Sequence, residues 1–135
     1  MKALIYKGKH DIVFDEVPKP EILYATDALV RVLNTTICGT DTGIYKGKNP
    51  EVAAGRVLGH EGIGIIEAIG DNVTNFKVGD KVLISCVTVC GSCSYCKKQL
   101  HAHCKDGGWI LGYQIDGVQA EYVRIPHANN SLYKI

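Results

Sequence analysis

The sequence lacks the features that mark membrane-spanning, secreted and nucleic-acid-binding proteins. No apolar run approaches the roughly 20 residues of a transmembrane helix. The first residues carry a lysine every few positions and include no apolar stretch of the kind that signal peptides contain. Lysine and arginine (15) nearly balance aspartate and glutamate (14), so we expect no basic surface for nucleic acid or for an anionic membrane. We therefore expect a cytoplasmic protein with neither of those partners.

Internal repeats, low-complexity tracts and composition breaks are absent as well, which favours a single domain. The 135 residues are 46% hydrophobic and 21% charged, as in ordinary globular proteins, and the 15 glycines suit a fold with many tight turns. Short stretches rich in β-branched residues alternate with Gly/Pro turn signals, which predicts a β-barrel or sandwich. The expected strands cover residues 2–6, 12–17, 28–36, 62–69, 81–86 and 120–125. Short helical pieces are expected near Cys38 and Ser94.

Four cysteines with short, regular spacing are the strongest chemical signal in the chain. Cys90, Cys93, Cys96 and Cys104 form the pattern C-x2-C-x2-C-x7-C. Four thiolates at such spacing can close around one tetrahedral zinc ion, and cysteines in a reduced compartment are more often metal ligands than disulfides. Disulfides, unligated thiols and an iron–sulfur cluster remain as alternatives. Ferredoxin sites open with the same spacing but continue with C-x3-C-P, which is absent here.

A second set of candidate metal ligands lies at expected strand ends. The run CGTD, from Cys38 to Asp41, follows one expected strand, and the run GHEG, from Gly59 to Gly62, precedes another. Cysteine, histidine and carboxylates all bind zinc, and a catalytic zinc has three protein ligands and one open position. Each run alone is weak, because a single cysteine is more often a small buried hydrophobe and a single histidine more often a structural hydrogen-bonding residue.

Together with the cysteine cluster, these runs resemble the catalytic domain of the zinc-dependent medium-chain alcohol dehydrogenases. The resemblance extends over essentially the whole chain, through further matching runs at residues 2–4, 62–64, 78–82 and 117–122. It implies one domain over residues 1–135 with a GroES-like fold. That fold is mainly β, a partly open β-barrel with a few short helices and a structural zinc-binding lobe at about residues 86–108.

The resemblance also implies roles for individual residues. Cys38 and His60 would bind a catalytic zinc, with Glu61 beside the metal. Thr40 would pass on the substrate proton, and Asp41 would orient a ligating imidazole. The structural zinc would be held by Cys90, Cys93, Cys96 and Cys104. Cys86 and Trp109 would line the alcohol pocket, although a buried cysteine and a packed aromatic ring explain these two residues equally well.

The implied reaction is oxidation of a small alcohol to an aldehyde or ketone, with hydride passed to NAD or NADP. Members of the family are homo-oligomers. No G-x-G-x-x-G strand–turn–helix unit is present in these residues, so we expect no cofactor-binding residue and no Rossmann cofactor domain among them. The family's third catalytic-zinc ligand also lies beyond Ile135. We therefore expect the chain alone to be inactive and its catalytic zinc to be weak or absent.

Two substitutions and one alternative function qualify this interpretation. Gly39 and Thr42 stand where some members carry a basic or imidazole side chain and a histidine, respectively. The alternative function is a non-catalytic, zinc-binding GroES-like interaction module, which would not need Cys38, His60 and Glu61 together.

Overall fold

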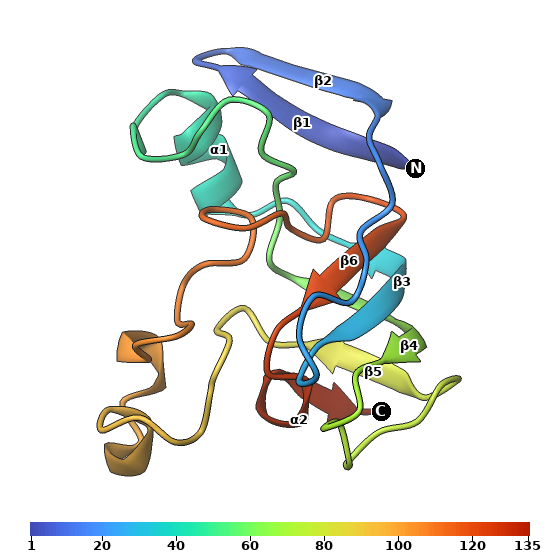
Figure 1. Cartoon of the computed structure of the whole chain (residues 1–135). Helices are drawn as coiled ribbons and strands as arrows, with labels where there is room; N and C mark the ends of the chain where they lie inside the picture. The colour runs from blue at the N-terminus through green and yellow to red at the C-terminus, as the bar shows by residue number, and fades with distance from the viewer.

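The protein folds into two antiparallel sheets with short helical segments between their strands (Figure 1). The computed structural model describes residues 1–135. The larger sheet has five strands in the order β6-β3-β4-β5-β7, and β1 and β2 form the smaller sheet. The strands are β1 (Lys2–Gly8), β2 (Asp11–Glu16), β3 (Ala28–Thr35), β4 (Gly62–Ile69), β5 (Lys81–Ile84), β6 (Tyr122–Ile125) and β7 (Leu132–Lys134). Isolated bridges from Ala3 to Ala120 and from Ile5 to Val57 join β1 to the rest of the chain.

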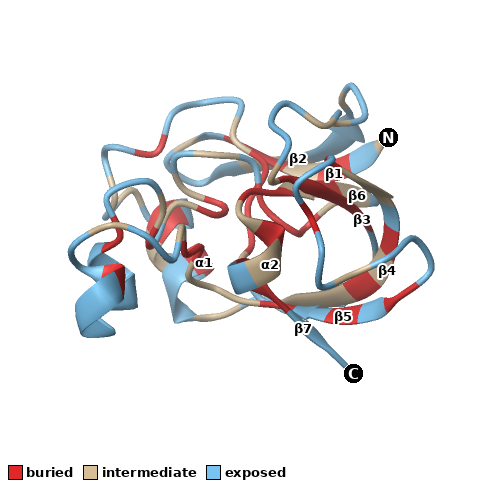
Figure 2. Cartoon of the chain, turned by 60° about the horizontal axis from the view of Figure 1, so that its bottom comes forward, coloured by how far each residue is buried: buried red, intermediate tan, exposed pale blue.

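The main core lies against one face of the larger sheet. Successive side chains of a strand point to opposite faces, and β5 and β6 accordingly alternate between buried and less buried residues. Figure 2 shows buried residues following these strands into the interior of the molecule. The buried members of this core are Ala28, Val30, Ile66, Val73, Val82, Ile84, Leu111, Val118, Val123, Ile125, Ala128 and Leu132.

The predicted, mainly β fold is confirmed, and every expected strand is present. Strand β5 ends two residues earlier than expected and β6 begins two residues later. A helix follows Cys38, as expected: α1 (Gly39–Tyr45). The short helical piece expected near Ser94 is also present, as the 3₁₀ helix η1 (Cys96–Lys98), and a second one, η2 (His101–His103), follows it.

Two C-terminal elements were not predicted. They are the four-residue helix α2 (Ala128–Ser131) and strand β7, which pairs with β5 at the edge of the sheet. Both are shorter than the periodic patterns by which helices and strands are recognised in a sequence. None of the helices is long and apolar enough to cross a membrane.

Asp80 closes the turn before β5 and binds the edge strand β7. Its carboxylate accepts a hydrogen bond from the backbone N–H of Lys77 at 3.0 Å and lies 2.9 Å from Lys134 Nζ. The hydrogen bond from Lys134 and that from Lys77 lower the pKa of Asp80 below its usual value. Because the folded-state pKa is depressed, the stabilisation is present above the unfolded-state pKa and is lost as pH falls through the folded-state value.

We predict that Asp80→Asn flattens the acid side of the stability profile. Urea unfolding measured between neutral pH and pH 3 should show a smaller loss of stability with falling pH in the variant than in the parent protein. Asp71→Asn, in an exposed turn, is the control and should leave the profile unchanged. Parallel acid profiles for Asp80→Asn and the parent would contradict the assignment.

Candidate metal centres

Cys38 is held at the start of α1 by the side chain of Asp41. Cys38 is the N-cap residue, with extended backbone angles (φ −116°, ψ −177°). The backbone N–H of Cys38 donates to Asp41 Oδ2 at 2.9 Å, so the carboxylate, three residues into the helix, fixes the chain where it leaves β3. Asp41 is only 5% exposed. The cysteine side chain is thus positioned by a rigid helix start.

His60 follows a backbone segment that is clamped by a second segment. The N–H groups of residues 117–119 donate to the carbonyls of residues 57–59 at 2.8–3.0 Å. Gly59 has φ +93°, and a Cβ atom there would lie 2.6 Å from Gln119 Cγ and 3.0 Å from Gln119 N. The GHEG run therefore begins with glycine because neither its backbone conformation nor its packing admits a side chain.

The two held segments bring a thiol and an imidazole together. Cys38 Sγ lies 3.3 Å from His60 Nε2, although the residues are 22 positions apart. Ligand atoms of Cys38, Asp41 and His60 all lie within 4.8 Å of one another. Asp41 Oδ1 is buried and has no hydrogen-bond partner, so a cation at this point would satisfy it. A thiolate, an imidazole and a free carboxylate oxygen are a donor set that fits zinc.

The carboxylates near this cluster come from α1 and from the GHEG run. Asp41 accepts the N–H of Cys38 with one oxygen and keeps the other free, so its expected role in orienting an imidazole stays a prediction. Glu61 Oε1 lies 3.9 Å from His60 Nε2 and the Glu61 side chain is 48% exposed, and its expected place beside the metal also stays a prediction. Two carboxylates, one buried and one exposed, are therefore in reach of a metal held by Cys38 and His60.

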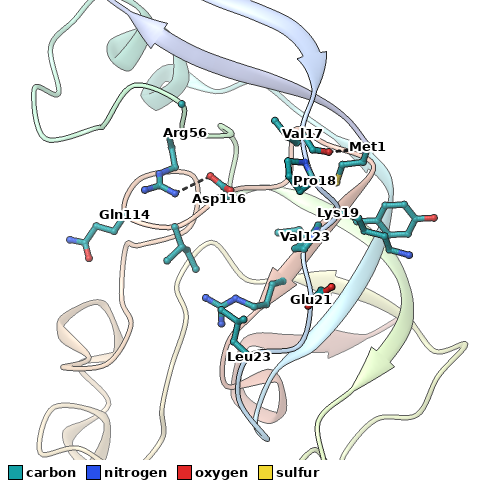
Figure 3. Close-up of a pocket in the computed structure, with 15 residues that line it drawn as sticks. Met1, Val17, Pro18, Lys19, Glu21, Leu23, Arg56, Gln114, Asp116 and Val123 are labelled. Atoms are coloured by element: carbon teal, nitrogen blue, oxygen red, sulfur yellow. Dashed lines mark hydrogen bonds and ion pairs between the residues drawn. The ribbon is translucent and has the colours of Figure 1, made fainter.

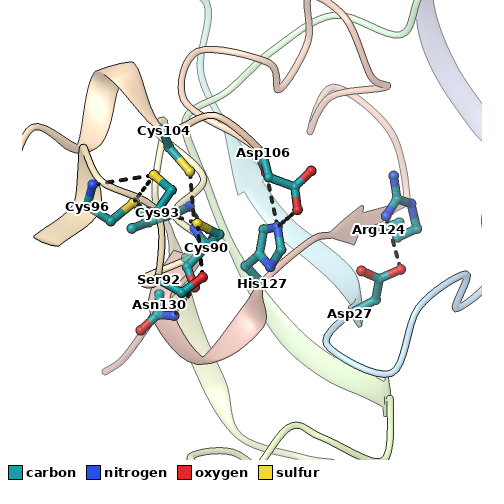
Figure 4. A network of polar contacts seen from close by, with 12 residues as sticks. Asp27, Cys90, Ser92, Cys93, Cys96, Cys104, Asp106, Arg124, His127 and Asn130 are labelled. Carbon is teal, nitrogen blue, oxygen red and sulfur yellow. Dashed lines mark hydrogen bonds and ion pairs between the residues drawn. The ribbon is translucent and has the colours of Figure 1, made fainter.

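The four spaced cysteines converge in a separate lobe (Figure 4). Their Sγ atoms lie within 4.8 Å of one another, with Cys93 3.5 Å and Cys90 3.8 Å from Cys96. All are free cysteines. The backbone N–H of Cys90 points to Cys104 Sγ at 3.3 Å, and such N–H···S contacts stabilise thiolates. Four converging sulfur atoms fit a tetrahedral zinc site.

The thiols of the lobe cannot easily all ionise without a cation. Hydrogen bonds from the backbone of Lys105 and of Cys96 lower the pKa of Cys93 to about 6. Burial raises the pKa of Cys96 to about 12. Opposite shifts in adjacent thiols are the expected result when several negative charges compete in a small, partly buried space. A divalent cation removes this competition, because a coordinating thiol is deprotonated outright.

A cavity of about 580 Å³ opens beside His60. Thr40 and Trp109 also line it, and the Trp109 ring meets the His60 ring edge-on at a centroid distance of 6.4 Å. Cys86 is not among its lining residues, so the expected pocket role of Cys86 stays a prediction. The segment from Ile110 to Gln114 forms much of the wall, and this role was not predicted because the segment carries no motif.

A second pocket, of about 530 Å³, contains none of the candidate metal ligands (Figure 3). Several of its charged groups are already paired: Arg56 Nη1 lies 2.9 Å from Asp116 Oδ1, and the Met1 amine donates to the carbonyl of Val17 at 2.7 Å. This pocket therefore offers little unsatisfied polarity to a ligand.

We predict that Gly59→Ala destabilises the protein by about 2–5 kcal/mol and disturbs the His60 site. Alanine is unfavourable at the positive φ of this position, and its Cβ atom would also collide with Gln119. Gly79→Ala is a matched control, because Gly79 also has φ +93° but nothing lies within 4 Å of its Cβ position. The control should cost only about 1 kcal/mol. Urea unfolding checks both values, and equal losses would show that packing at Gly59 is unimportant.

Comparison with known proteins agrees with these features. Residues 24–135 match the family model described as the alcohol dehydrogenase GroES-like domain. The chain belongs to this family. Its relatives include an uncharacterised zinc-type alcohol dehydrogenase-like protein, AdhB, of Bacillus subtilis, which is 38% identical over the whole chain and 39% of its own length. The L-threonine 3-dehydrogenase of Caldanaerobacter subterraneus is 38% identical over 92% of the chain and 35% of the relative.

Solved structures of the same kind superpose closely on the chain. A zinc-dependent alcohol dehydrogenase 2 from Streptococcus pneumonia, in its apo form, has a TM-score of 0.95 and 57% identity, over 99% of this chain and 38% of that one. The alcohol dehydrogenase TADH from Thermus sp. ATN1 has a TM-score of 0.95 and 38% identity, over 100% of this chain and 40% of that one. The chain thus spans less than half the length of these relatives. The GroES-like fold predicted from the sequence is confirmed.

Proposed function

We propose that the chain forms the zinc-binding part of an alcohol dehydrogenase that converts a small alcohol to an aldehyde or ketone. The observation that carries this proposal is the approach of Cys38 Sγ to within 3.3 Å of His60 Nε2 at the edge of a cavity. Membership of the alcohol dehydrogenase family supports it.

In the proposed site, Cys38 and His60 hold the zinc, and Asp41 or Glu61 supplies a carboxylate oxygen. Zinc, when bound, acts as a Lewis acid that lowers the pKa of a hydroxyl beside it, and NAD or NADP, when bound, accepts hydride. A glycine-rich nucleotide-binding unit is not among these residues, so we propose that the longer relatives' additional length is where such a unit lies. The lobe cysteines hold a second, structural zinc.

The side chains around the cavity have separate roles in this proposal. The Thr40 hydroxyl lies in the cavity wall with His60 and relays the proton of the substrate hydroxyl toward solvent, giving up its own proton as it accepts the substrate's. The hydroxyl of Thr42 donates to the carbonyl of Gly39 at 2.9 Å and fixes the first turn of α1. Trp109 and the apolar side chains of Ile110 and Leu111 cover the substrate and exclude water.

Cobalt replacement tests whether the Cys38–His60 cluster holds a metal. Cobalt(II) bound to thiolate absorbs strongly in the near ultraviolet, and the two proposed sites differ in their sulfur content. We expect a four-thiolate spectrum to saturate first and a weaker one-thiolate spectrum to follow with further metal. The chain alone should not reduce NAD or NADP, because no nucleotide-binding unit is among its residues; we expect turnover with primary or secondary alcohols only from a longer protein that joins such a unit to it. Absence of the one-thiolate spectrum and of turnover in that longer protein would favour a zinc-binding interaction module instead.

A further inference from the structure

The cavity beside His60 contains polar side chains that oxidation of a simple alcohol does not use. Asn49, Tyr113 and Gln114 line it together with Thr40 and His60. Its volume of about 580 Å³ is within the range of about 300–1,000 Å³ that small-molecule sites have. In such sites a few polar groups fix the orientation of the ligand. The three unused side chains are therefore candidates for contact with a second polar group of the substrate.

Two of these three side chains are explained in other ways. Partial burial and a hydrogen bond with Glu51 raise the pKa of Tyr113, so its hydroxyl stays protonated and already has an acceptor. Gln114 is exposed, and it also lines the second pocket, so its side chain is not confined to the cavity beside His60. Asn49 is the remaining candidate, and it is half-buried.

Local structure does not explain an asparagine at position 49. Asparagine is common where the backbone takes a positive φ, but Asn49 is not among the positive-φ residues of the chain. Asparagine is also common where its side chain bonds to the backbone of a turn. Here the backbone carbonyl of Asn49 accepts the N–H of Val52 at 3.2 Å, whereas its side-chain amide makes no hydrogen bond to another residue. The amide is thus free to bind a ligand in the cavity.

The Asn49 amide lies against α1, close to Thr40. Asn49 Oδ1 is 3.4 Å from the place that a Cβ atom of Gly43 would occupy, so the missing side chain of Gly43 lets the amide pack on the helix. Thr40 is three residues earlier on the same helix, which is a rise of about 4.5 Å along its axis. Two groups that can bind hydroxyls therefore line one cavity, less than one helical turn apart along α1.

We propose that the substrate of this cavity is a small diol, with its two hydroxyls on alternate carbon atoms, and that Asn49 binds the hydroxyl that does not react. This inference rests on the proposed function, in which the reacting hydroxyl lies beside Thr40. An amide offers both a donor and an acceptor, and a hydroxyl can pair with either. A site that bonds a substrate hydroxyl discriminates against the analogue lacking it, because the polar group of the protein is then left without a partner.

The test compares 1,3-butanediol with 2-pentanol, in which a methyl group replaces the second hydroxyl. Each is titrated into ¹⁵N-labelled, zinc-loaded chain, and the backbone amides of residues 40–49 and the side-chain NH₂ signals of Asn49 are followed. We expect the diol to bind at least about fivefold more tightly than 2-pentanol, which corresponds to about one hydrogen bond. Only the diol should move the Asn49 side-chain signals.

Asn49→Leu should reverse this preference, because leucine replaces the amide with an apolar group of similar size. Asn72→Leu, in an exposed turn, is the matched control and should keep the parental preference. Should Asn49→Leu lose its dispersed spectrum, Asn49→Ala takes its place and must also abolish the preference for the diol.

Three outcomes overturn the diol assignment. They are equal binding of the two alcohols by the parent chain, absence of saturable shifts with the diol, and a diol preference that survives loss of the Asn49 amide. The last result would mean that both hydroxyls bind the zinc. The cobalt spectrum of the Cys38–His60 cluster judges the proposed function separately. If the one-thiolate spectrum is present and the two alcohols bind equally, the diol assignment fails while the proposed function stands.

Discussion

Cys93→Ser is expected to lose the zinc of the lobe and to unfold residues 86–108. The lobe has a very small hydrophobic core of its own, since its buried hydrophobic cluster consists of Val89, Cys96 and Cys104, and two of these are proposed ligands. Structural zinc contributes about 10–16 kcal/mol in small metal-binding peptides, whereas a whole domain is stable by about 5–15 kcal/mol. The proposed zinc would therefore take the place of a hydrophobic core here, and we expect loss of one thiolate to remove most of what holds the lobe together.

Metal analysis and limited proteolysis measure this loss. The lobe carries exposed lysines at Lys97, Lys98 and Lys105, so trypsin should cut the variant there much faster than the parent protein. Ser94→Ala changes an exposed lobe residue that is no ligand, and it should keep both the zinc and the protease resistance. A Cys93→Ser protein that retains its zinc and resists trypsin would refute the four-thiolate site.

The sequence predicted those features that local spacing or alternation determines. The four lobe cysteines lie within 15 residues, so their spacing alone indicates convergence. Strands such as β3 and β4 were placed correctly because long runs of β-branched residues are bounded by turn signals. The fold class followed from the number of such strands and from the family resemblance.

Features that depend on packing between segments far apart in the chain could not be predicted from the sequence. The free oxygen of Asp41 becomes visible only once its other oxygen is seen to bind the N–H of Cys38. The segment from Ile110 to Gln114 lines the same cavity as His60. Residues 117–119, which follow that segment closely in the chain, are hydrogen-bonded to residues 57–59, which come directly before His60. Strand β7 has only three residues and exists through its pairing with β5. Burial of Asp27 likewise depends on β6, which lies 97 positions away at Arg124.

His60→Ala is expected to reduce alcohol oxidation, the activity proposed for this domain when it is joined to a nucleotide-binding unit, by at least about a hundredfold. His60 approaches both Cys38 Sγ and the cavity, so its loss removes a proposed ligand and leaves the metal a thiolate and carboxylates. Even residues that only orient metal ligands affect affinity or activity by about 10–100-fold, and a direct ligand should matter more. Steady-state reduction of NAD or NADP with the best alcohol measures the effect.

The cobalt spectrum decides whether this loss is due to metal binding or to misfolding. In His60→Ala, the four-thiolate absorption of the lobe should persist, while the weaker one-thiolate absorption of the Cys38 cluster should vanish. His101→Ala replaces an exposed histidine of the lobe and should keep both spectra and full turnover. If His60→Ala keeps near-parental turnover, the imidazole is not a zinc ligand, and its 3.3 Å contact with Cys38 is then a structural hydrogen bond. If both spectra disappear together, the two centres depend on one fold and the activity loss says nothing about His60 alone.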